Sequence, residues 1–202
     1  MALKNKIILN KLTFVGFDIE TTGLDSKDHE IVEIGAVRFS IEEGLMDTFS
    51  SLVAPENPIP PKLTKIHGIT NEMVKDAPSI ESVLKDFIEF IGEDPLLAHN
   101  AKFDARFIAY YLGQHELSYG KNPIYDTLPL SRKIVPDSEN HKLPTLVKNF
   151  RIKVSQAHRA LDDSKACMEV FMKLMSLWMG NEDKYLSDLN TLNRPVRFSR
   201  FV

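Results

Sequence analysis

The sequence predicts an α/β fold in which one mixed sheet is covered by helices, and three patterns support it. Two segments rich in β-branched and aromatic residues, 12–19 and 31–39, are joined by a turn-rich connection and predict neighbouring strands. A third segment, 46–53, alternates apolar and polar side chains before a proline-rich stretch, which completes a three-stranded meander. Beyond it, strand-like and helix-like segments alternate, which is typical of parallel strands joined by helices.

The elements after the meander follow from the spacing of apolar residues. Residues 80–91 carry an apolar stripe at helical spacing and predict a helix. Short apolar runs at 95–98 and 124–125 predict buried strands, with a helix over about 102–112 between them. A wide apolar stripe predicts a last long helix from about 161 to 179.

The length of 202 residues and mass of 23.0 kDa fit a single domain, which we expect to span residues 1–180. Residues 181–202 form a C-terminal tail with three arginines and two phenylalanines near its end. Such a composition can bind single strands by charge and stacking. A flexible tail, or one that docks a partner, is the favoured interpretation.

Composition and charge restrict the possible functions. With 43% hydrophobic and 26% charged residues, the chain resembles ordinary globular proteins and neither a disordered nor a collagen-like one. The 25 basic and 28 acidic residues give a net charge of −3, which disfavours sequence-independent coating of nucleic acid. The net charge is still compatible with a site that binds only a few nucleotides and in which metal ions supply the positive charge. No membrane-length apolar run or cleavable signal is recognised, so we expect a cytoplasmic protein with no membrane partner.

Acidic residues stand at three element ends where apolar residues would be expected. Asp18 and Glu20 lie at the end of an apolar strand, and period-two geometry places both carboxylates on one face. Asp104 falls in the first turn of the helix that follows residues 95–98, and His158 and Asp163 open the last helix. Closely spaced carboxylates repel each other unless a cation offsets their charge, which favours Mg²⁺ or Mn²⁺.

Four motifs of this chain resemble those of the DEDDh 3′→5′ exonucleases, and most closely the proofreading epsilon subunit of DNA polymerase III. They are Phe-Asp-Ile-Glu-Thr-Thr-Gly-Leu from Phe17, His-Asn-Ala-Lys-Phe-Asp from His99, His-Arg-Ala-Leu-Asp-Asp from His158, and Ile-His-Gly-Ile-Thr from Ile66. The resemblance implies a ribonuclease H-like fold, with a mixed five-stranded sheet whose second strand is antiparallel and which helices flank.

The resemblance also implies the catalytic residues. Asp18, Glu20, Asp104 and Asp163 would hold two divalent metal ions, Mg²⁺ or Mn²⁺. His158 would be the general base, because histidine exchanges protons near neutral pH. The family spacing of the histidine and the aspartate selects Asp163 and leaves the adjacent aspartate pointing away from the ions.

Six residues are implied to grip the terminal nucleotide: Thr21, Thr22, Leu24, Ile66, His67 and Phe103. The two threonines would offer backbone contacts to the 3′ hydroxyl, the leucine would wedge between the last bases, and the other three would pack the terminal sugar and base. Alternatively, the leucine covers the core at a turn and the histidine caps a short helix.

The resulting hypothesis is a metal-dependent 3′→5′ exonuclease that releases nucleoside 5′-monophosphates from single-stranded or frayed DNA 3′ ends. Its role would be proofreading with a DNA polymerase subunit, or end trimming. The alternatives are an RNA 3′→5′ exonuclease, similar to ribonuclease T or oligoribonuclease, and an inactive nucleic-acid-binding module. The sequence leaves the sugar preference, the partner and the oligomeric state open.

Overall fold

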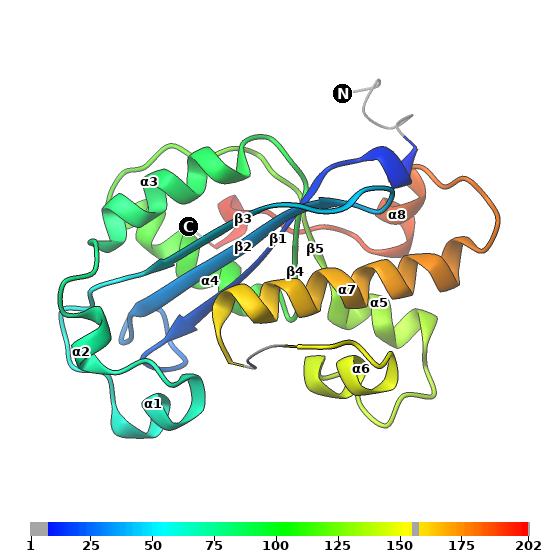
Figure 1. The fold of residues 1–202 in the computed structure, drawn as a ribbon. Coiled ribbons are helices and arrows are strands. Elements are labelled where there is room, and N and C mark those ends of the chain that lie inside the picture. The colour runs from blue at the N-terminus through cyan, green and yellow to red at the C-terminus, as the bar shows by residue number, and fades with distance from the viewer. Residues whose placement is uncertain (1–7, 155–157, 202) are drawn as a thin grey trace.

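The computed structural model describes residues 8–154 and 158–201, and its centre is one five-stranded sheet (Figure 1). The strands stand in the order β3-β2-β1-β4-β5. Strand β2 is antiparallel to both of its neighbours, whereas β4 and β5 run parallel to β1. The strands are β1 (Phe14–Thr21), β2 (Ile31–Ser40), β3 (Gly44–Leu52), β4 (Leu96–Ala98) and β5 (Ile124–Asp126). The predicted fold, including its antiparallel second strand, is confirmed.

The helices that the sequence predicted are present, together with several short ones. They are α1 (Pro61–His67), α2 (Asn71–Val74), α3 (Ile80–Ile91), α4 (Lys102–Gln114), α5 (Thr127–Ile134), α6 (Leu143–Asn149), α7 (Ala160–Met179) and α8 (Leu186–Leu192), with 3₁₀ turns at Leu9–Lys11 and Phe198–Arg200. Helices α1, α6 and α8 were not predicted, because seven residues are too few to show a periodic apolar stripe. No helix in the described part of the chain is both long and apolar enough to cross a bilayer.

The two faces of the sheet have separate cores. Odd-numbered residues of β1, such as Phe17, pack in a core with α3 and α4. Even-numbered Phe14 packs on the opposite face, in a core that includes much of α7. Helices α3 and α7 lie on opposite sides of the sheet (Figure 1). Because side chains alternate along a strand, Asp18 and Glu20 share the face that α7 covers.

Helix α7 begins in very close contact with β2, at a glycine. A Cβ atom on Gly35 would lie 2.2 to 2.6 Å from backbone atoms of Ala160 and Leu161, so a side chain at this position would push the helix away. The Ser164 hydroxyl completes the contact by donating a hydrogen bond to the Gly35 carbonyl at 3.0 Å. The start of α7 is therefore fixed against the middle of the sheet.

The segment after α7 packs onto the domain over its described residues. Val196 forms an antiparallel bridge with Ile124 at the β5 edge. The Phe198 ring is 1% exposed and lies 6.3 Å from the Phe17 ring in the core. Residues 181–201 thus pack against the domain in this structure. The sequence alone had favoured a tail that is flexible or docks a partner.

Candidate active site

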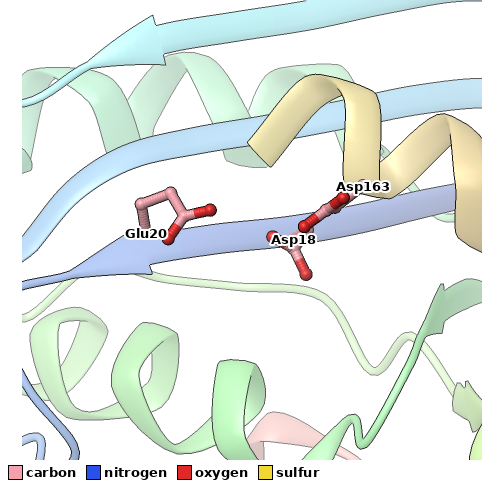
Figure 2. Close-up of side chains that lie close together, drawn as sticks. All are labelled: Asp18, Glu20 and Asp163. Atoms are coloured by element: carbon pink, nitrogen blue, oxygen red, sulfur yellow. The ribbon is translucent and has the colours of Figure 1, made fainter. Parts of the chain in front are cut away.

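Three carboxylates from two elements meet beside the sheet. Asp18 and Glu20 project from β1, and Asp163 projects from the first turn of α7 toward them (Figure 2). Each offers an oxygen atom, and these oxygens all lie within 4.8 Å of one another. The alternation of β1 and the docking of α7 on β2 together produce this cluster.

The fourth predicted carboxylate, Asp104, approaches β1 from α4. It is only 3% exposed, and one of its oxygens accepts a hydrogen bond of 3.3 Å from the Ile19 amide, between the two acidic residues of β1. It does not belong to the group of three oxygens defined above. Asp104 nevertheless raises the pKa of Asp18 by electrostatic repulsion, second only to the effect of burial.

Burial and mutual repulsion make the charged form of this cluster costly. The pKa of Asp18 is well above its usual range, first because of burial and then because of the surrounding carboxylates. Burial, followed by repulsion from Asp163, raises the pKa of Glu20 to about 8. Burial likewise raises the pKa of Asp104 to about 8. Near neutral pH, the cluster therefore retains protons or requires a cation.

The structure distinguishes the two adjacent aspartates at the start of α7. Asp163 faces Asp18 and Glu20. Asp162 instead lies 3.7 Å from the Lys165 ammonium and lines a hollow of about 230 Å³ to which none of the three grouped carboxylates contributes. Consecutive helical residues project about 100° apart, so only one of the two can join the cluster.

His158 lies just before α7 and is exposed to solvent. Its backbone adopts a left-handed conformation with φ of 61°, which is uncommon for a residue with a side chain. Burial raises the pKa of Asp163, and His158 opposes that shift by its charge and through its backbone. The histidine therefore neighbours the carboxylate cluster from the solvent side.

The two threonines after the cluster are mostly buried and hold the following loop. The Thr21 hydroxyl donates to the Gly23 carbonyl at 2.6 Å, and the Thr22 hydroxyl accepts from the Glu30 amide at 2.9 Å. The Thr22 amide donates to the Glu30 carbonyl at 2.8 Å. A contact from the Thr22 amide to a ligand would therefore have to replace this existing bond.

The remaining residues predicted to grip a nucleotide differ sharply in exposure. Leu24 is 79% exposed and Ile66 is 53% exposed, so neither is a core residue. Phe103 is partly buried, with its ring 5.2 Å from that of Phe107. His67 is 2% exposed, and its Nδ1 accepts the Ile69 amide at 3.0 Å. The alternative that Leu24 covers the core is therefore wrong, whereas His67 is enclosed by protein.

Glu33 is a charged residue near the site that the sequence analysis missed. It is 1% exposed, lies in β2 directly opposite Glu20, and raises the pKa values of Asp18 and Glu20. A lone glutamate in the otherwise apolar segment 31–37 is the signal that could have identified it.

The residues present fit a divalent cation. Three half-buried carboxylates lie close enough to share an ion, and carboxylate oxygens are the ligands that Mg²⁺ and Mn²⁺ prefer. A bound cation would offset the repulsion that raises their pKa values.

Comparison with known proteins assigns the family. The chain matches the RNase_T family, described as Exonuclease, over residues 15–171. It is 38% identical over 168 residues to DNA polymerase III subunit epsilon of Aquifex aeolicus, covering 82% of each chain. It is 44% identical over 179 residues to the PolC-type DNA polymerase III of Caldanaerobacter subterraneus subsp. tengcongensis, covering 89% of this chain but only 13% of that protein.

A solved structure with related sequence agrees with this assignment. Exonuclease X in complex with 5′ overhanging duplex DNA is 28% identical, with a TM-score of 0.66, and the match covers 88% of this chain and 98% of that one. The family match, the ribonuclease H-like fold and the acidic cluster indicate a nuclease that uses divalent metal. The chain therefore belongs to the DEDDh exonuclease family and has subunit epsilon of DNA polymerase III among its relatives.

Proposed function

We propose that this protein is a metal-dependent 3′→5′ exonuclease that hydrolyses DNA ends to nucleoside 5′-monophosphates. The observation that carries the proposal is the convergence of Asp18, Glu20 and Asp163 in a chain of the exonuclease family. The exposed side chains of Leu24 and Ile66 add apolar contacts of the kind that can engage a terminal base.

Four carboxylates would hold the metal in this proposal. Asp18, Glu20 and Asp163 supply the three grouped oxygens, and Asp104 supports the same position from α4. We expect two ions, Mg²⁺ or Mn²⁺, which when bound would neutralise charge on the phosphate and on the leaving oxygen and would favour deprotonation of water.

His158 is the proposed general base. It lies on the solvent side of Asp163, where an incoming water can reach it. The water oxygen forms a bond to phosphorus while His158 takes its proton, and the bond between phosphorus and the 3′ oxygen of the preceding nucleotide breaks. That 3′ oxygen takes a proton from solvent and becomes the new chain end, while the phosphate leaves on the 5′ oxygen of the released nucleotide.

Restriction to a chain end requires contacts with the terminal nucleotide. Leu24 would separate the last bases: its side chain is exposed on the loop after β1, and the hydrogen bonds of Thr21 and Thr22 hold that loop. Ile66 and Phe103 would pack the terminal base and sugar. Because His67 is enclosed, its contact with a nucleotide would require the surrounding side chains to move.

The named relatives support DNA as the substrate and a polymerase as a partner. Two of them are DNA polymerase III proteins, and Exonuclease X was solved with duplex DNA carrying 5′ overhangs. Proofreading with a polymerase subunit, on a single-stranded or frayed end in the cytoplasm, is therefore the role we propose for this chain.

Substrate choice is tested with matched oligonucleotides of one sequence as single-stranded DNA, single-stranded RNA, and duplex DNA with a paired or mispaired 3′ end. We expect DNA to be degraded at least about 10-fold faster than RNA and the mispaired end faster than the paired one, because a frayed end costs less to engage. Asp18→Asn serves as the control for contaminating nuclease. Faster cleavage of RNA than of DNA would refute the DNA assignment.

A further inference from the structure

Glu33 and Arg159 form a nearly enclosed ion pair next to the acidic cluster. The Arg159 Nη2 atom lies 2.6 Å from Glu33 Oε1, and the Arg159 Nε atom lies 3.2 and 3.1 Å from the two carboxylate oxygens. Such two-point contact fixes the relative orientation of both side chains. The Glu33 side chain is only 2% exposed and that of Arg159 is 26% exposed.

The same carboxylate also caps helix α7. Arg159 occupies the N-cap position, where Ser, Thr, Asp or Asn would normally supply an acceptor, and its side chain makes no cap hydrogen bond. Glu33 Oε2 instead accepts the Ala160 amide at 2.9 Å, from a strand 127 positions away in sequence. Glu33 thus binds both the residue before the helix and the first residue within it.

The pair lies between the groups proposed to perform catalysis. His158 directly precedes Arg159 and holds a left-handed backbone. The Asp163 amide donates to the Arg159 carbonyl at 2.9 Å, in the first turn of the helix. On the strand side, Glu33 is the register partner of Glu20. The ion pair therefore joins β2 to the start of α7, and Glu33 is in turn paired with Glu20 of β1 through the sheet.

We propose that Glu33 and Arg159 are positioning residues that hold His158 and Asp163 in register with Asp18 and Glu20. The proposal rests on the function proposed above. It adds Glu33 and Arg159 as residues that orient the catalytic groups without contacting the substrate. Displacing the start of α7 by about 1 Å would lower turnover without removing any catalytic group.

A pair that only stabilises the fold and a pair that positions the site differ in how activity responds when both residues are replaced. Replacing both members of a buried ion pair with uncharged residues is often neutral or stabilising, whereas removing one member leaves an unpaired buried charge. If the pair only stabilises the fold, replacing both residues together should preserve both stability and activity. If the pair positions the site, the double replacement should preserve stability but not activity.

The test compares Arg159→Met, Arg159→Lys and the double variant Glu33→Gln with Arg159→Met. The glutamine still offers an oxygen to the Ala160 amide, and the double variant leaves no unpaired charge. Arg38→Met is the matched control, because Arg38 lies on the same strand and pairs with Asp94 and the Phe90 carbonyl away from the site. Thermal melting, kcat, KM and the melting shift on adding Mn²⁺ are measured for each.

We expect Arg159→Met to melt at lower temperature than wild type, and the double variant to regain most of that loss. The kcat of the double variant should stay at least about 10-fold low with KM changed by less than about 3-fold, since the groups are intact but misplaced. Its Mn²⁺-induced melting shift should be smaller than that of wild type. Arg159→Lys should not rescue kcat, because an ammonium cannot reproduce the two-point contact. Arg38→Met should lose stability and keep kcat.

Recovery of kcat and of the Mn²⁺ shift together with stability in the double variant would overturn the positioning role. So would rescue of kcat by Arg159→Lys. Failure of wild-type protein to hydrolyse any 3′ end would instead overturn the proposed function. In that case the Mn²⁺ shift alone still tests whether the pair shapes the acidic cluster.

Discussion

Asp163→Asn is expected to lower kcat at least about 100-fold, whereas Asp162→Asn retains near-wild-type turnover. The two residues are adjacent in the first turn of α7, but only Asp163 brings an oxygen within 4.8 Å of those of Asp18 and Glu20. Asp162 faces Lys165 instead, and its charge contributes only a small interaction with the helix N-terminus. Initial rates on an end-labelled oligonucleotide provide the measurement.

The comparison separates catalysis from folding because both substitutions are isosteric and remove one charge from the same helix turn. Both variants should melt within a few degrees of wild type when no divalent cation is present. An inactive Asp162→Asn variant together with an active Asp163→Asn variant would show that Asp162, and not Asp163, is the metal ligand. If both variants were active, the start of α7 would have no catalytic role.

Removal of divalent cations is expected to abolish hydrolysis, and Mg²⁺ or Mn²⁺ should restore it. Asp18, Glu20 and Asp163 bring three carboxylate oxygens within 4.8 Å of one another. Arg159 offsets the raised pKa of Glu20 only in small part, so a phosphate would be repelled from the cluster without a cation. Calcium should bind but support little turnover, because its coordination is looser. The measurement is the rate after exhaustive chelation and after addition of each cation. Undiminished cleavage by the chelated protein would exclude this site.

The same cations should stabilise the fold more at pH 8 than at pH 6. The pKa values of Glu20 and Asp104 are raised to about 8, so the folded state binds more protons than the unfolded chain between about pH 4 and 8. Their contribution to stability is complete below about pH 4 and is lost as the pH rises through about 8. A cation replaces those protons most readily at pH 8, where saturating Mg²⁺ should raise Tm by roughly 5–10 °C.

The quantity compared is the Mg²⁺-induced change in Tm at each pH. Groups that do not interact with the cation affect Tm equally with and without Mg²⁺, so their pH dependence cancels. A Mg²⁺-induced shift as large at pH 6 as at pH 8 would contradict the coupling between protons and cation in this cluster. The Asp162→Asn variant should show the wild-type pattern, since its carboxylate lies outside the cluster.

Short-range patterns were enough to predict the elements that carry the site. Period-two alternation correctly placed Asp18 and Glu20 on one face of β1, since every second residue of a strand faces the same way. The family spacing in the last motif implied Asp163, and the structure places an oxygen of Asp163 with those of Asp18 and Glu20 while Asp162 faces Lys165. Both patterns depend on a few consecutive residues, whose geometry is set by the local backbone.

Features that depend on distant segments were not predictable in the same way. The contact between Glu33 and Arg159 joins residues 126 positions apart and exists only because α7 docks on the Gly35 backbone. The burial of Phe198 likewise depends on the chain returning to the β5 edge. His67 and Ile66 are adjacent in sequence, yet only the packing of α1 decides that the first is enclosed and the second exposed.

The most direct test of the central claim follows the fate of a linear DNA strand labelled at its 5′ end, beside a covalently closed single-stranded circle of the same sequence. We expect the linear strand to shorten one nucleotide at a time from its 3′ end, with release of nucleoside 5′-monophosphates, while the circle stays intact and Asp18→Asn leaves both unchanged. Immediate release of the label as a mononucleotide, or opening of the circle by the wild-type protein, would contradict a 3′→5′ exonuclease.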